Sequence, residues 1–296
     1  VLSHQIESFG DWVEQLIAES TGKEGRGLVP VVGETLGAPG VYGSDRLFVY
    51  ISLEEDDAYR GQIKMFEHAG HPVVSIILRD VYDMGGQFFL WEMATAVAGH
   101  ILGINPFDQP DVESAKILTK QAVKQYAERG TLPGLVPKIS DSDMAVYGEL
   151  SGDDVEESLQ HFMENACDGS YVTVQAYLQP TDEIGAALQA FRMKIRDRYH
   201  RATTLGYGPR FLHSTGQLHK GDGGRGLFIQ ITAEEPSDIA IPDNAGENES
   251  TLSFGVLISA QVLGDWQALR EAGRQVIRFH VKGDIVEGIK RLSRSV

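Results

Sequence analysis

The chain has 296 residues, of which 42% are hydrophobic and 23% charged, a composition ordinary for a globular protein of one large or two medium domains. Its formal net charge of −16 argues against a surface for nucleic acid or anionic membrane, because such surfaces need clustered Lys and Arg. The same charge still allows a phosphorylated substrate, which requires only a few local hydrogen-bond donors.

The side chains that could hold metals or form disulfides are few. The single cysteine, Cys167, excludes an internal disulfide framework and fits a reducing cytosol, so we expect a cytoplasmic protein. The nine histidines offer no more than an isolated close pair such as His213 and His219, which is too little for a metal site, so we expect neither a metal nor an organic cofactor. No apolar run in the sequence approaches the roughly 20 residues of a membrane span.

Val1 stands just ahead of a helical pattern in place of an initiator Met, which suggests part of a longer protein.

Helix and strand patterns alternate in the first part of the chain. Apolar spacing predicts helices over 6–20 and 54–69, and strands over 28–32, 47–53 and 73–78. Strands that are joined by helices form parallel sheets with helices on their faces. We therefore predict an α/β fold with a parallel sheet.

Two more helices meet at the Asn-Pro turn of residues 105–106. An apolar helix is predicted over 88–102, and the proline cannot continue it. Asp108 is a suitable N-cap for the next helix. The turn therefore fixes the direction of a helix that carries Lys116.

Composition divides the chain into two units. It turns towards Pro, Gly, Ser and Asp in the middle of the chain, which predicts a linker over 136–155 between a first unit, 1–135, and a second unit, 156–296. In the second unit the alternation returns, without a Rossmann or Walker glycine fingerprint. The predicted elements there are helices over 155–165, 181–199, 254–272 and 285–292, strands over 171–178, 202–205, 227–232 and 276–281, and a polar loop over 234–250.

The two units also echo each other in sequence. Residues 67–78 (EHAGHPVVSIIL) parallel 270–281 (REAGRQVIRFHV), and residues 46–51 parallel 226–231. We interpret this echo as a repeat of one α/β unit. The alternative is that junctions from helix through glycine to strand look alike in unrelated folds.

The longest motif ends at Lys116. Residues 88–116, FFLWEMATAVAGHILGINPFDQPDVESAK, resemble the C-terminal signature of the phosphoglucose isomerase family. In that family the closing lysine lies in the active site, which implies that Lys116 helps to open the ring and orient the sugar oxygens. Gln109, in the same stretch, is then expected to contact the substrate. Without the resemblance, Lys116 would be an ordinary solvated lysine.

A second motif contains Glu19. Residues 12–23, WVEQLIAESTGK, resemble another signature of the same family, in which this glutamate is the base that moves the proton. Aldose–ketose isomerisation moves a proton between neighbouring carbons, and one carboxylate that reaches both can carry it through an enediol(ate). Lys23 and Arg26, in the following turn, would offset enediolate or phosphate charge, although both residue types are common on surfaces.

The histidine of the family is displaced in this chain. Where family members have a histidine that helps to open the sugar ring, YGSDR at residues 42–46 has Asp45 or Arg46, and Arg46 is kept as a candidate for substrate contact. The LHSTGQ segment of residues 212–217 resembles the missing segment, which in family members comes from the neighbouring subunit. Our hypothesis is that the second unit stands in for that neighbour and supplies His213, with His219 as the alternative.

The chain as a whole resembles the C-terminal part of bifunctional transaldolase/phosphoglucose isomerases. This implies two tandem sugar-isomerase (SIS)-like units of three-layer α/β structure, with upstream isomerase and transaldolase domains. The implied activity is interconversion of glucose 6-phosphate and fructose 6-phosphate in glycolysis and gluconeogenesis. The alternatives are a non-catalytic phosphosugar-binding module, or an incomplete fragment that lacks the upstream phosphate-binding loop. The second unit could also serve only as an assembly surface.

Overall fold

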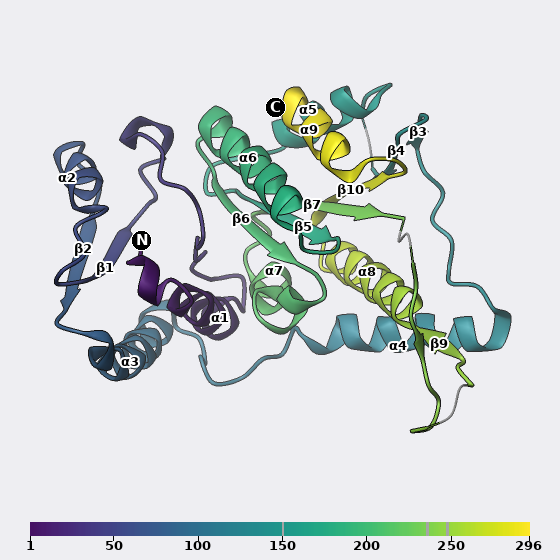
Figure 1. Ribbon diagram of the computed structural model, residues 1–296, viewed down its shortest axis with the longest axis horizontal. Helices are drawn as coiled ribbons and strands as arrows, with labels where there is room; N and C mark the ends of the chain where they lie inside the picture. The colour runs from purple at the N-terminus through teal and green to yellow at the C-terminus, as the bar shows by residue number, and fades with distance from the viewer. Residues whose placement is uncertain (150, 235–236, 247–248) are drawn as a thin grey trace.

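The computed structural model describes residues 1–149, 151–234, 237–246 and 249–296. Helices and strands alternate along most of these ranges, and the strands form a two-stranded sheet, a six-stranded sheet and a small two-stranded ribbon. In Figure 1 the two-stranded sheet lies at the left, and the six-stranded sheet lies between α6 and α8. Most strand pairs in the two main sheets are parallel. The predicted α/β class is therefore confirmed.

The N-terminal part is built around one parallel pair of strands with helices on both faces. Its elements are α1 (Phe9–Thr21), β1 (Phe48–Leu53), α2 (Arg60–His68), β2 (Val73–Leu78), α3 (Met84–Leu102) and α4 (Glu113–Arg129). On one face, Ile51 and Leu53 of β1 share a core with Phe9 of α1. On the other, the ring of Phe48 lies 4.3 Å from that of Phe66 in α2. Helices thus cover both faces of β1, as a buried parallel strand requires, whereas much of β2 is exposed.

The six-stranded sheet has the order β3-β4-β10-β7-β5-β6. Its elements are β3 (Ile139–Ser140), β4 (Met144–Gly148), α5 (Val155–Glu164), β5 (Tyr171–Tyr177), α6 (Asp182–Tyr199), β6 (Ala202–Tyr207), α7 (Gly216–Gly221), β7 (Gly226–Ala233), α8 (Phe254–Glu271), β10 (Gln275–Val281) and α9 (Ile285–Ser295). Alternate residues of the central strands, such as Val172, Ile229 and Ile277, are fully buried in one core with α5, α6 and α9. The opposite face is covered by α7 and α8, and it carries most of the polar residues discussed below.

Local signals in the sequence account for several element boundaries. The side chain of Thr181 accepts a 3.2 Å hydrogen bond from the backbone N–H of Ile184, which confirms the predicted cap of α6. Gly70 and Gly273 follow α2 and α8 with φ of 86° and 72°, a left-handed conformation that glycine adopts without strain. The echoing segments thus form the same arrangement, β1–α2–β2 and β7–α8–β10, each with its two strands paired in parallel.

The predicted strand over residues 28–32 is wrong. These residues, all of them described, belong to no sheet. Pro30 has no N–H to donate to a ladder, and the valines on either side of it pack against the cluster that contains Trp266. Arg192 donates a 2.9 Å hydrogen bond to the carbonyl oxygen of Val32. The segment is therefore held in place by side chains of the second unit.

Part of the predicted linker over 136–155 is sheet instead. β3 and β4 lie inside it, and β4 pairs antiparallel with β10. Met144 and Val146 are fully buried at alternate positions, a strand pattern that the surrounding Asp and Ser residues obscure in the sequence. Residue 150, also within the predicted linker, lies outside the described residues. The division of the chain into two domains stays a prediction.

The predicted polar loop over 234–250 is only partly described, because residues 235–236 and 247–248 lie outside the described ranges. Its described part contains β8 (Ala240–Ile241), which pairs antiparallel with β9 (Leu252–Ser253). Asp243 also accepts hydrogen bonds from the backbone N–H and the hydroxyl of Thr251. A short ribbon therefore precedes α8.

Helix α3 has apolar residues on nearly every side. Its inner face packs on α1, where Phe88 meets Phe9 and Trp12 edge to face. A second stripe at four-residue spacing remains exposed, with Phe89 67% and Ile101 76% accessible. Such an apolar stripe is unusual on a surface helix, which normally has one polar face.

Candidate active site

Glu19 lies in the last turn of α1, where the helix meets a Gly-rich turn. The helix ends at Thr21, whose hydroxyl donates to the carbonyl oxygen of Ile17 at 2.7 Å and accepts from the N–H of Leu28 at 3.0 Å. One turn before Glu19, the amide of Gln15 donates a 3.2 Å hydrogen bond to the Glu19 carboxylate. The carboxylate is thereby oriented while its side chain stays partly exposed.

A pocket of about 300 Å³ opens beside Glu19. Its walls come from α1 and from the segment that follows α3. The lining residues are Trp12, Gln15, Leu16, Glu19, Ser20, Pro106, Phe107 and Gln109. The volume is at the lower end of the roughly 300–1,000 Å³ typical of small-molecule sites. Two motifs separated in sequence thus form one pocket, which brings together the predicted residues Glu19 and Gln109.

The segment that carries Gln109 is held by its own polar side chains. Asn105 accepts a 3.1 Å hydrogen bond from the N–H of Phe107 and donates a 3.0 Å bond to Asp108. Asp108 does not cap a helix as predicted, because α4 begins only at Glu113. The carboxylate of Asp108 turns back to Asn105 and to the end of α1.

Lys23 links this segment to the end of α1. Its ammonium group donates to the Asp108 carboxylate at 3.1 Å and also to the Asp108 carbonyl oxygen. The side chain of Lys23 is 0% exposed, so it does not face the substrate side of the turn as expected. Its ammonium group offsets the charge of Asp108 and fixes the wall of the pocket.

Gln217 of the HSTGQ motif joins both segments to the second unit. Its side-chain amide donates to the carbonyl oxygen of Gly22 at 2.8 Å and to the Asp111 carboxylate at 2.7 Å. Its carbonyl oxygen accepts from the N–H of Asp111 at 2.9 Å. Gly22 approaches α7 so closely that a Cβ there would lie 2.2 Å from the Cα of Leu218, so the position requires glycine. All three motifs therefore meet at the end of α1.

Other predicted site residues lie elsewhere. Lys116 is exposed in the first turn of α4, where its ammonium group pairs with Glu113 at 2.8 Å. Arg26 is exposed in the turn after α1. Arg46 pairs with its neighbour Asp45 at 2.5 Å, and its Nη2 is buried with no hydrogen-bond partner in the described structure. None of these three cations lines the pocket beside Glu19 as the structure describes it.

The two candidate histidines have opposite environments. His213 is exposed at the end of the short helix η4 (Arg210–His213), whose first residue lies 3.4 Å from Asp11 of α1. His219 is 2% exposed in α7, its ring 5.1 Å from that of Phe228. Burial lowers the pKa of His219 well below its usual value, and the nearby Lys220 lowers it further. His219 is therefore a neutral core residue and does not reach the pocket.

Comparison with known proteins gives one consistent result. The chain is 29% identical over 157 residues to a probable glucose-6-phosphate isomerase of Methanococcus maripaludis, which covers 40% of this chain and 35% of the relative. It is 29% identical to the glucose-6-phosphate isomerase of Clostridium tetani and 30% identical to that of Bacillus cytotoxicus, in each case over 38% of this chain and 33% of the relative. Over part of its length, the chain is related to glucose-6-phosphate isomerases.

The chain spans about a third of the length of these isomerases. No family model matches it. Among solved structures, a hypothetical protein from Thermus thermophilus aligns over 83% of this chain and 55% of its own, at 15% identity and a TM-score of 0.37. Within the described ranges, no helix is both long and apolar enough to cross a membrane, and no cluster of His, Cys, Asp and Glu could hold a metal ion.

One ionisable residue of the isomerase-like motif escaped the sequence analysis. Glu14 lies on the side of α1 that faces the second unit, and burial, helped by Asp11, raises its pKa to about 7. Arg210 and Arg192 act in the opposite direction. One sequence signal could have indicated that Glu14 is buried. Gly10 and Ala18 lie one helical turn before and after it, and small residues at this spacing indicate a closely packed helix face.

Replacing Glu14 with glutamine should stabilise the protein above pH 7. Because the pKa of Glu14 is raised from 4.5 to about 7 on folding, the folded state holds its proton more tightly, and stability falls as pH rises through this window. The shift corresponds to about 3 kcal/mol. Denaturant unfolding at pH 5 and pH 8 should therefore show a smaller loss in Glu14→Gln than in the parent, with the exposed Glu7→Gln as control. Equal losses in all three proteins would contradict the assignment.

Proposed function

We propose that the chain carries the proton-transfer site of an aldose–ketose isomerase that interconverts glucose 6-phosphate and fructose 6-phosphate. The observation that carries the proposal is the pocket that Glu19 and Gln109 share, because its two walls are the two isomerase-like motifs. The partial similarity to glucose-6-phosphate isomerases supports the same activity.

In the proposed reaction Glu19 removes the proton from C2 of the open-chain aldose phosphate. The electron pair of that C–H bond forms the C1–C2 double bond while the π pair of the C1 carbonyl group moves onto O1, which gives an enediolate. After a proton has passed from the C2 hydroxyl group to O1, the C2 carbonyl bond forms and the same carboxyl group returns its proton to C1 to give the ketose. Gln15 holds one oxygen of the Glu19 carboxylate, and Gln109 lies on the opposite wall where it can bind a sugar hydroxyl. Lys116 and His213 enter the proposal, for ring opening, on the resemblance alone.

The direct test is turnover of fructose 6-phosphate by the 296-residue chain. Glucose 6-phosphate formation is followed with a coupled dehydrogenase, and binding is measured separately by calorimetry. We expect both turnover and binding. Binding without turnover would favour a phosphosugar-binding module instead. Neither binding nor turnover would contradict the proposal for this chain.

A further inference from the structure

A row of polar residues crosses the six-stranded sheet on the face beneath α7 and α8. Gln175 of β5, Gln230 of β7, Arg278 of β10 and Tyr147 of β4 stand directly opposite one another in register. Gln230 is fully buried, and its amide donates to the side-chain oxygen of Gln175 at 3.0 Å. Central strands of a parallel sheet are normally apolar on both faces, so this row needs a physical reason.

Arg278 is the charged member of the row and is only 6% exposed. Its Nε and Nη2 donate to the Gln230 side-chain oxygen at 3.1 and 3.0 Å, and Nη2 also donates to the Val262 carbonyl oxygen at 3.2 Å. The guanidinium group lies over the ring of Trp266, 4.7 Å from its centre. All of these partners are neutral.

The positive charge of Arg278 has no anionic partner among the described residues, none of which forms an ion pair with it. Asp265 is linked to Arg278 through Gln230, whose amide donates to the Asp265 carboxylate at 3.2 Å, but the charge of Asp265 is already paired with that of Lys220 at 2.7 Å. Burial lowers the pKa of Arg278 to about 10, so the group still carries its charge at neutral pH. A buried cation with only neutral partners is costly, and an anion beside it would offset that cost.

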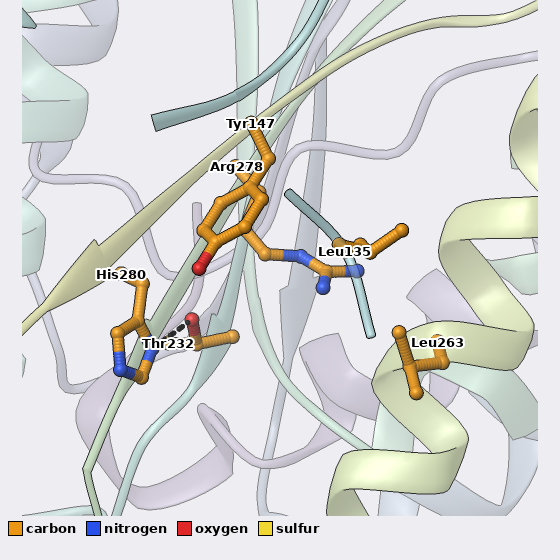
Figure 2. Close-up of a pocket in the computed structure, with 6 residues that line it drawn as sticks. All are labelled: Leu135, Tyr147, Thr232, Leu263, Arg278 and His280. Carbon is orange, nitrogen blue, oxygen red and sulfur yellow. Dashed lines mark hydrogen bonds between the residues drawn. The ribbon is translucent and has the colours of Figure 1, made fainter. Parts of the chain in front are cut away.

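A pocket of about 140 Å³ lies beside Arg278 (Figure 2). The residues that line it are Leu135, Tyr147, Thr232, Leu263, Arg278 and His280. Figure 2 shows the guanidinium group extending towards the side formed by Leu135 and Leu263, and the Tyr147 hydroxyl pointing towards His280 and Thr232. The hydroxyl of Thr232 lies 3.0 Å from Nδ1 of His280, which orients the imidazole. The pocket thus offers one cation and several neutral polar groups.

The size and place of the pocket limit what it can hold. Its volume is less than half of the roughly 300 Å³ at the lower end of whole-ligand sites, so it suits a single charged group. Thr232 and His280 lie near the carboxyl ends of the parallel strands β7 and β10, the end at which open α/β sheets bind ligands. It shares no lining residue with the pocket beside Glu19.

We propose that this second pocket binds an oxyanion, either inorganic phosphate or the phosphate or carboxylate group of a small molecule. Arg278 supplies the charge and donates from its guanidinium group, and the Tyr147 hydroxyl donates a further hydrogen bond. Thr232 and His280 share one hydrogen bond, so one of the two, the hydroxyl or the imidazole Nε2–H, donates to the anion as well. The proposal does not depend on the isomerase function, because its residues belong to β4, β7, β10, α8 and the segment after α4.

The test uses inorganic phosphate as the probe and a charge placed at the mouth of the pocket. Leu135 is 37% exposed, so a polar residue there should not disturb folding. Leu135→Glu places a carboxylate near Arg278 and should weaken phosphate binding by about tenfold or more, whereas the matched neutral Leu135→Gln should change it by less than about twofold. Binding is followed by calorimetry on the 296-residue chain.

A second variant addresses the cation itself. Arg278→Met removes the charge, and we expect phosphate binding to be lost in protein whose circular dichroism matches that of the parent. If this variant fails to fold, the comparison at Leu135 decides alone. No phosphate binding by the parent, or equal affinities for Leu135→Glu and Leu135→Gln, would overturn the proposal. Fructose 6-phosphate is then added as a competitor. If it displaces phosphate equally well from the parent and all variants, the phosphate binds in the pocket beside Glu19 instead, and the proposal is wrong.

Discussion

Replacing Glu19 with glutamine should lower kcat for fructose 6-phosphate isomerisation by about 10²–10⁴-fold, the usual contribution of a positioned general base. The amide has almost the shape of the carboxylate and can still accept the hydrogen bond from Gln15, but it cannot take a proton from carbon. KM should change little, because the contacts of the pocket with the bound sugar remain. Steady-state kinetics by the coupled assay measures both quantities.

The matched control for this prediction is Glu24→Gln. Glu24 is an exposed acid in the turn that follows α1, so its replacement removes the same charge close to the site without touching the pocket. We expect its kcat to stay within about twofold of the parent, since an exposed charge is largely screened by salt. A kcat for Glu19→Gln that is close to that of this control would show that another group moves the proton.

The elements that the sequence predicted well are those with local causes. The bounds of β2 agree with the prediction, because an apolar run between a Gly-His-Pro turn and a polar segment has few other structures open to it. The start of α6 follows from Thr181 and its bond to Ile184. For the pocket beside Glu19, both of the motifs that form its walls were predicted as site segments. Their contact in space was not predicted, because no local sequence pattern reports it.

The parts that were not predicted depend on distant contacts. From the sequence alone Lys23 is expected to be a surface lysine, because its partner Asp108 lies 85 residues away. His219 is a plausible loop histidine until α7 is packed against Phe228. The sequence of β4 has only a weak strand pattern, and the segment forms a strand because it pairs with β10, which lies far along the chain. In each case burial was decided by tertiary structure, which single-residue patterns do not contain.

The motif around His213 illustrates the same limit. Its two histidines were predicted as site residues, whereas in the structure the side chains of Gln217 and Lys220 join α7 to its surroundings. Gln217 bonds to the end of α1, and Lys220 bonds to Asp265 of α8. The geometry of the candidate active site therefore depends on α7 staying packed against α1 and α8.

Lys220→Met should destabilise the protein by about 3–5 kcal/mol, the usual cost of removing one member of a buried ion pair. The side chains of Lys220 and Asp265 are 4% and 0% exposed, and their charged atoms lie 2.7 Å apart. Without the lysine, the Asp265 carboxylate keeps a 3.2 Å hydrogen bond from Gln230 but no cation pairs with it. The free energy of unfolding in urea, measured at pH 7, gives the cost directly.

The double variant Lys220→Met/Asp265→Asn separates charge from packing. Its asparagine oxygen can still accept from Gln230, and the lost lysine no longer leaves a carboxylate without its cation, so the double variant should recover most of the stability that Lys220→Met loses. The same loss in both variants would mean that the packing of the lysine stem, and not its charge, holds α7. With α7 loosened, Gln217 would no longer hold Gly22 and Asp111 together, so Lys220→Met should also weaken sugar phosphate binding at the pocket beside Glu19, and the double variant should restore it.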